Sequence, residues 1–122
     1  MKKLLILPIF TIILSCYNQE CNCELYKTGK FEFIQEIDGK KNTTVFERTE
    51  SLQIETYEGK TDTASIRWVN NCEFILQKLK PRNRQEKKAI SMRILSTTKN
   101  SYTFEYSFVG SEQKEKGTAT KI

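Results

Sequence analysis

The chain has 122 residues, a formal net charge of +5 and no histidine. This length is enough for one compact domain but not for two. Histidine is the usual proton shuttle near neutral pH and the commonest metal ligand, so its absence argues against acid–base catalysis and against a metal centre. We therefore expect a protein that is not an enzyme and needs no cofactor. The charge is too small to indicate a nucleic-acid partner.

Residues 1–15 have the order of a bacterial export signal. Two lysines precede an uncharged and largely apolar run, Leu4–Leu14, and the small residue Ser15 stands before Cys16. The run is shorter than the ~20 residues that cross a bilayer, and Pro8 interrupts it, so a membrane span is not expected. A buried N-terminal helix is the remaining alternative. We predict a signal peptide over residues 1–15.

The tetrapeptide Ile13-Leu14-Ser15-Cys16 resembles a lipobox, the cleavage motif of lipoprotein signal peptidase. The resemblance implies that Cys16 becomes the first residue of the mature protein and carries a diacylglycerol, usually with a further acyl chain on its amino group. Each buried methylene contributes ~0.8 kcal/mol, so several chains anchor a protein stably. Residues 16–22 then form a lipidated tether, and residues 23–122 form a single domain.

The other cysteines are Cys21, Cys23 and Cys72, an odd number for an exported protein. One disulfide with one cysteine left over is the simplest arrangement. Cys72 can pair with Cys21 or Cys23 across a loop of about fifty residues, which stabilises the fold by roughly 4 kcal/mol in a chain-entropy estimate. We favour Cys23 because it is nearer the folded part. The single residue between Cys21 and Cys23 does not match the two-to-four spacing of structural zinc sites.

From Lys30 onward the apolar residues recur with a period of two, which predicts β-strands. Turn residues separate them at Asp38-Gly39, Glu58-Gly59, Lys99-Asn100 and Gly110, and Asn70-Asn71 has the composition of a two-residue hairpin turn. The expected strands cover residues 30–37, 43–49, a stretch from 51 towards the turn at 58, 63–69, 72–80, 89–97, 102–108 and 115–122.

About eight antiparallel strands in sequence order predict an all-β meander that closes or curls into a barrel, with a two-sheet β-sandwich as the alternative. Most glutamates in the strands alternate with apolar residues, so we expect them on the outer face. These are Glu32, Glu47, Glu55, Glu73 and Glu105.

Six aromatic residues fall on the predicted inner face and are the candidate ligand-binding residues. They either fill the interior or line a cavity for an apolar ligand, because a barrel of eight strands lies at the boundary between these outcomes. They are Trp68, Phe74, Tyr102, Phe104, Tyr106 and Phe108.

A basic segment, residues 81–88, interrupts the strand pattern. Arg82, Arg84, Lys87 and Lys88 face a single acidic residue, Glu86. Charge runs of this kind are usually solvated loops. Contact with anionic lipid headgroups is the alternative, because the predicted tether keeps the domain near a bilayer.

Two sets of residues resemble known proteins. The leader is similar to lipoprotein signals of Gram-negative bacteria, and Tyr17 stands where inner-membrane lipoproteins commonly carry aspartate, which implies the outer membrane. The mature chain is similar to small uncharacterised lipoproteins of Bacteroidota, especially flavobacteria. Some of these carry the name DNA topoisomerase IV, an activity whose ATPase and DNA-gate domains we do not expect in a chain of this length. The similar stretches are Cys23, YKTGKFEF at 26–33, RTESLQIE at 48–55 and SIRWVNNCEF at 65–74.

The opening Gly29-Lys30-Phe31 also resembles the Gly-x-Trp start of lipocalins, with phenylalanine in place of tryptophan. That resemblance implies a ligand-carrying barrel. We therefore expect a lipid-anchored envelope protein that binds a small apolar ligand or an envelope component. The alternative is a protein–protein interaction module of the envelope with a fully packed core.

Overall fold

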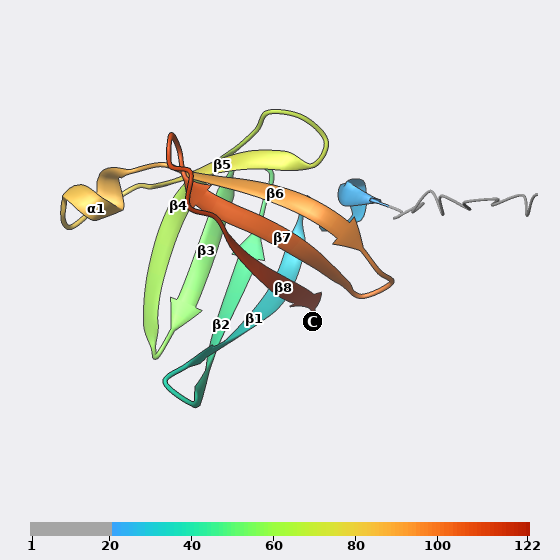
Figure 1. Cartoon of the computed structure of the whole chain (residues 1–122), viewed down its shortest axis with the longest axis horizontal. Coiled ribbons are helices and arrows are strands. Elements are labelled where there is room, and N and C mark those ends of the chain that lie inside the picture. Colours follow the sequence, from blue (N-terminus) through green and yellow to red (C-terminus); the bar gives the residue numbers. More distant parts are fainter. Residues whose placement is uncertain (1–20) are drawn as a thin grey trace, which may run out of the picture.

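The computed structural model describes residues 21–122, so the predicted signal peptide, Cys16 and most of the predicted tether lie outside the described residues. Eight antiparallel strands follow one another around a closed barrel, as Figure 1 shows, which confirms the all-β meander and the barrel over the sandwich. The elements are η1 Cys23–Tyr26, β1 Gly29–Ile37, β2 Lys40–Arg48, β3 Leu52–Tyr57, β4 Lys60–Trp68, β5 Glu73–Lys78, α1 Arg84–Lys87, β6 Ile90–Thr97, β7 Ser101–Phe108 and β8 Glu115–Lys121.

Two tight hairpins join β1 to β2 and β3 to β4. Asp38 and Gly39 have positive φ angles of 52° and 78°, and Glu58 and Gly59 have 50° and 78°. Two consecutive positive φ angles make a turn whose twist matches that of the paired strands. Strands β2 and β4 therefore begin directly after the turns, three residues earlier than predicted. The Asn70-Asn71 prediction was wrong in detail, because β4 ends at Trp68 and β5 begins at Glu73, which leaves a connection of residues 69–72.

The short helix η1 closes one end of the barrel, and the sequence pattern did not predict it. Its Cys23 forms a disulfide with Cys72 in the β4–β5 connection, as expected, and the neighbouring Cys21 is exposed with a free thiol. The Tyr26 hydroxyl donates a hydrogen bond to the Thr98 carbonyl oxygen at 2.7 Å. The disulfide and this hydrogen bond attach the first turn of the domain to two different interstrand connections.

The barrel closes along a short seam between β1 and β8. Only Phe31–Phe33 of β1 pair with β8, whereas β1 pairs with β2 along its whole length, Gly29–Ile37. Gly117 of β8 lies where the rings of Phe33 and Phe104 approach closely, and a Cβ atom there would be 2.6 Å from Phe33 and 2.9 Å from Phe104. A residue without a side chain is therefore required at this point of the barrel wall.

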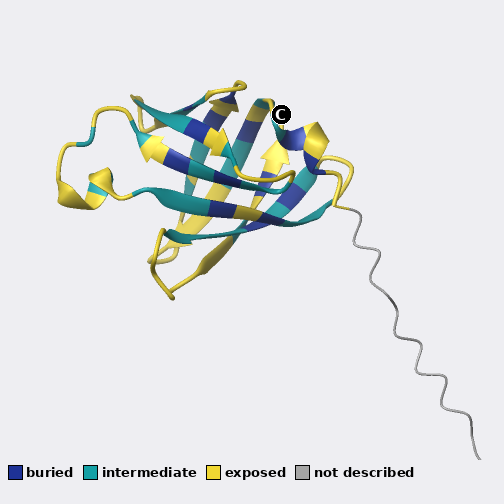
Figure 2. Ribbon diagram, turned by 90° about the horizontal axis from the view of Figure 1, so that it is seen from above, coloured by how far each residue is buried: buried dark blue, intermediate teal, exposed yellow. Residues whose placement is uncertain are grey.

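Burial divides the barrel into two halves. Figure 2 shows that the buried residues concentrate towards η1, while the β1–β2 and β3–β4 hairpins and α1 are exposed. We call the half capped by η1 the closed end and the opposite half the mouth; η1 and α1 lie on opposite sides of the barrel in Figure 1. Aromatic rings fill the closed end, with Phe31 and Tyr102 fully buried. Any space for a ligand is therefore expected at the mouth.

Candidate ligand-binding site

The inward face of the sheet changes from apolar to polar between the closed end and the mouth. The inward pair Phe31 and Phe46 joins β1 to β2 in the closed end, and the same face continues to the pair Gln35 and Asn42 near the mouth. Between β3 and β4 the corresponding inward pair is Glu55 and Asp62. Two carboxylates directly opposite each other destabilise a sheet unless other groups balance them. Their environment is therefore informative about function.

Arg48 occupies the centre of the closed end with 2% of its surface exposed. Its guanidinium donates hydrogen bonds to the Tyr26 carbonyl oxygen at 2.6 Å, to the Tyr102 hydroxyl at 2.8 Å and to the Gln53 side-chain oxygen at 3.1 Å. Its carbon Cζ also lies 4.6 Å from the centre of the Phe74 ring. The planar donor fork and the ring faces together replace the water that a buried guanidinium would lose.

Gln53 connects this buried charge to the mouth. Its side-chain nitrogen donates to Oε1 of Glu55 at 3.1 Å, while its oxygen accepts from Arg48. Burial raises the pKa of Glu55, and the hydrogen bond from Gln53 and the positive charge of Lys78 partly offset that effect. Glu55 is thus held in a fixed orientation, facing the open half of the barrel.

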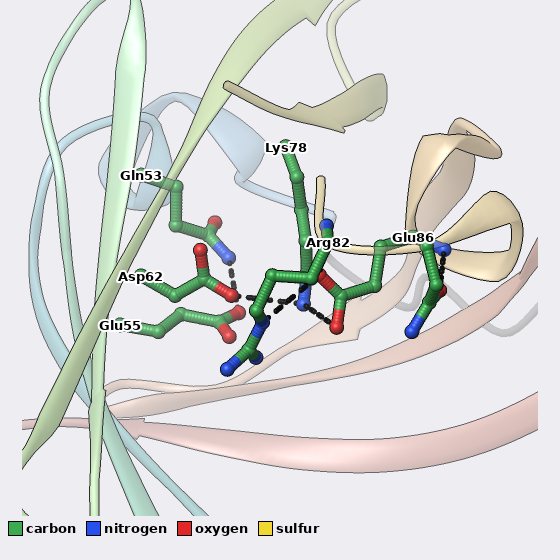
Figure 3. A network of polar contacts seen from close by, with 7 residues as sticks. Gln53, Glu55, Asp62, Lys78, Arg82 and Glu86 are labelled. Atoms are coloured by element: carbon green, nitrogen blue, oxygen red, sulfur yellow. Dashed lines mark hydrogen bonds and ion pairs between the residues drawn. The ribbon is translucent and has the colours of Figure 1, made fainter. Parts of the chain in front are cut away.

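Lys78 is the centre of a network of charged groups at the mouth, shown in Figure 3. Its ammonium lies 2.8 Å from a carboxylate oxygen of Asp62 and 3.7 Å from one of Glu86, which belongs to α1. Glu86 also accepts hydrogen bonds from the backbone N–H of Arg82 at 3.0 Å and from its Nε at 3.3 Å. These hydrogen bonds lower the pKa of Glu86. The network joins strands β3, β4 and β5 to the loop that carries α1.

Two adjoining cavities surround this network. The larger has a volume of about 910 Å³ and opens at the mouth, and the smaller has about 180 Å³ and lies under α1. Both are bordered by Glu55, Asp62 and Lys78. The larger is lined mostly by polar residues of β1 to β5 and the loop after β5. The smaller adds the apolar side chains of Ala64, Leu76, Ile90 and Phe108.

The structure places most of the candidate aromatic residues in the packed closed end. Trp68 lies 4.5 Å from Phe74 between ring centres, and Tyr102 and Phe104 are buried. None of these four borders either cavity. Phe108 does border the smaller cavity. The inward-facing aromatic residues of β7 therefore reach the candidate site only at the end of the strand nearest the mouth. Tyr106 lies between the two groups and is partly buried against the core.

The four basic residues of the segment 81–88 have different environments. Arg82 is paired with Glu86, and the Lys88 ammonium lies 5.6 Å from the centre of the Phe108 ring. Arg84 and Lys87 are exposed residues of α1. Asn83 caps this one-turn helix by accepting a hydrogen bond from the Glu86 N–H. The predicted solvated loop is thus partly ordered, and it lies at the end of the barrel opposite η1 (Figure 1).

The expectation that Glu55 faces outward was wrong. Gln53, with 3% exposure, points inward on the same face of β3 as Glu55, so the alternating residues Leu52 and Ile54 lie on the outer face. The reason is the cross-strand partner, since Gln53 lies opposite Arg48 and supplies one of its acceptors. A polar partner for a buried guanidinium outweighs the small gain from burying leucine and isoleucine.

Sequence reasoning did not select Arg48, Asp62 or Lys78. Period-two counting could have found them, because Arg48 shares a strand face with Phe46, Asp62 with Ala64, and Lys78 with Phe74 and Leu76.

Among residues 21–122 no group of three or more potential metal ligands is present, and no helix there is long and apolar enough to cross a membrane. Comparisons with protein-family models, with curated proteins and with solved structures found no match to this chain.

Proposed function

We propose that this protein is a lipid-anchored protein of the cell envelope that binds a small amphiphilic molecule in the mouth of its barrel and does no chemistry on it. One observation carries the proposal: a cavity of about 910 Å³ with charged side chains on its inner surface, in a barrel whose other half is filled. Ligand sites in proteins usually measure roughly 300–1,000 Å³ and combine apolar walls with a few oriented polar groups.

The lining of the two cavities defines the kind of ligand. The charged residues Glu55, Asp62 and Lys78 favour a polar headgroup, because a wholly apolar molecule would bury them without replacing their water. The apolar niche beneath α1 favours a small hydrocarbon or aromatic body beside that headgroup. We therefore replace the expected apolar ligand by an amphiphile seated at the mouth.

The anchor and the location remain part of the proposal. The lipobox-like sequence ending at Cys16 supports lipidation, and the residue after it supports the outer membrane of a Gram-negative bacterium. The domain begins at Cys23, so at most residues 17–22 separate it from the lipid, a reach of about 20 Å. A ligand-binding protein at this position would act within the envelope, close to a bilayer.

Native mass spectrometry of the protein purified from the envelope of its own host tests the proposal. We expect a bound small molecule that leaves on denaturation. Thr44 lines the cavity, whereas its neighbour Thr43 is exposed on the outer face, so Thr44→Trp should remove the ligand and Thr43→Trp should retain it. A wild-type protein that is always recovered empty, or equal occupancy in the two variants, would contradict a binding site in the mouth.

A further inference from the structure

The segment that carries α1 places a carboxylate of the chain itself inside the candidate site. Glu86 approaches Lys78 and accepts two hydrogen bonds from Arg82, and its side chain is only 18% exposed although α1 buries none of its residues. Figure 3 shows this carboxylate reaching towards the ammonium of Lys78. Glu86 therefore occupies the position that an acidic group of a ligand would need.

The α1 helix has no buried residues, and the hydrogen bonds and ion pairs of Glu86 are its main attachments to the barrel. Besides Glu86, the side-chain nitrogen of Gln77 donates to the Lys87 carbonyl oxygen at 3.1 Å, and Lys88 lies over the Phe108 ring. An element without buried apolar side chains opens at low free-energy cost. The segment can therefore leave the mouth while the barrel stays folded.

The charges of the larger cavity favour an anion. Four cationic side chains border it, Lys60, Lys78, Lys80 and Arg82, against the carboxylates Glu55 and Asp62. Asp62 is already paired with Lys78 at 2.8 Å, so the two carboxylates do not offset all four cations. Glu86 offsets one of the two positive charges that remain, and only while α1 is in place.

We propose that the ligand carries an anionic headgroup, such as a carboxylate, which takes the place of Glu86 beside Lys78 and Arg82 and so displaces α1 from the mouth. This inference rests on the proposed function, because it names the chemistry of the same site. The apolar body of the ligand then occupies the space that α1 leaves, against Leu76, Ile90 and Phe108 of the barrel strands. Glu86 is the competitor that the ligand must displace, so binding and opening of α1 are one event.

Three probes with the same apolar body separate the headgroup classes: phenylpropionate, phenylpropylamine and phenylpropanol. Affinity is measured by ligand-observed NMR on the full-length lipoprotein in lipid nanodiscs, with empty discs as the reference. We expect phenylpropionate to bind best. Glu86→Gln should tighten its binding about three-fold, the effect of one partly exposed ion pair. Lys78→Met should weaken it about ten-fold through loss of a charge-assisted contact, and Lys78→Arg should preserve it.

Matched controls carry the same charge changes on the outer face of the barrel. Glu47→Gln and Lys116→Met alter exposed residues outside both cavities, so neither should change the affinity. Amide hydrogen exchange of residues 82–88 should also increase when phenylpropionate binds to the wild-type protein. No exchange increase, no effect of Glu86→Gln, or preferred binding of the amine would each overturn the displacement of Glu86 by an anion.

The two proposals fail in different ways. If the amine binds best and Thr44→Trp blocks it, the mouth still binds ligands and only the anionic class is wrong. If Thr44→Trp changes neither the recovered host ligand nor the affinity for phenylpropionate, the mouth is not the binding site and both proposals are wrong.

Discussion

Replacing the buried arginine by lysine should destabilise this protein more than replacing it by methionine. Arg48 makes three hydrogen bonds, at 2.6, 2.8 and 3.1 Å, to acceptors spread around its planar group. A lysine ammonium keeps the positive charge but cannot reach three separated acceptors from one nitrogen. If it retains one of them, two charge-assisted hydrogen bonds of about 1.5–3 kcal/mol each are lost. The expected loss of unfolding free energy for Arg48→Lys is therefore about 3–6 kcal/mol.

Arg48→Met also loses these hydrogen bonds, but it removes the buried charge and so avoids its desolvation cost. Its flexible side chain can pack among the rings of Phe31, Phe46 and Phe74. We therefore expect Arg48→Met to be less destabilising than Arg48→Lys, the reverse of the order expected from chemical similarity.

Urea unfolding of the oxidised protein at pH 7 measures both variants. Arg67→Lys on the exposed face of β4 is the matched control and should change the unfolding free energy by less than about 0.5 kcal/mol. Two results would show that the buried guanidinium does not act through its directional hydrogen bonds. One is an unfolding free energy of Arg48→Lys within about 1 kcal/mol of the wild-type value. The other is an unfolding free energy of Arg48→Met clearly lower than that of Arg48→Lys.

Four further predictions concern single features of the chain. Replacing both Cys23 and Cys72 by serine should lower the unfolding free energy by about 2–4 kcal/mol in urea titrations, and an unchanged midpoint would rule out a stabilising disulfide. Phe104→Ala should cost about 3–5 kcal/mol by the same measurement, because Phe104 is buried, and a negligible cost would contradict its place in the core. Cys16→Ala should abolish palmitate labelling in cells, and persistent labelling would exclude Cys16 as the anchor. Because the folded-state pKa of Glu55 is raised, the contribution of this carboxyl to the free energy of unfolding is most favourable at low pH and declines as pH rises through that pKa. Glu55→Gln should thus gain stability relative to wild type between pH 4 and pH 8. A difference in urea midpoints that stays constant over this range would contradict the buried carboxyl.

The strand pattern could be predicted from the sequence because most inward faces are uniform. In β7 every second residue is aromatic, so only one orientation buries the apolar surface, and the prediction agrees with the structure. One disulfide with one cysteine left over followed from the cysteine count, and Cys23 was favoured over Cys21 as the partner of Cys72 because it is nearer the folded part. The meander and its closure into a barrel could therefore be predicted from residue types and spacing, whereas the sequence left open whether the inward aromatic residues fill the interior or line a cavity.

The candidate site was harder to predict from the sequence because it depends on polar residues that point inward. In β3 one face carries Leu52 and Ile54 and the other carries Gln53 and Glu55, residues of similar size. Which face points into the barrel is decided by Arg48 on the neighbouring strand β2, which lies opposite Gln53. Glu86 enters the site through a one-turn helix, for which the sequence has no apolar period. Such contacts depend on which polar side chains point inward on neighbouring strands, and the spacing of apolar residues does not give that direction.

The short seam between β1 and β8 determines where local opening of the barrel begins. Beyond Phe33, β1 continues to Ile37 without strand pairing to β8. Unzipping should therefore start at this margin and stop near the fully buried Phe31, where the closed end is held by the disulfide and the Arg48 hydrogen bonds. Separation of β1 from β8 would in this way widen the mouth of the barrel while the closed end stays folded.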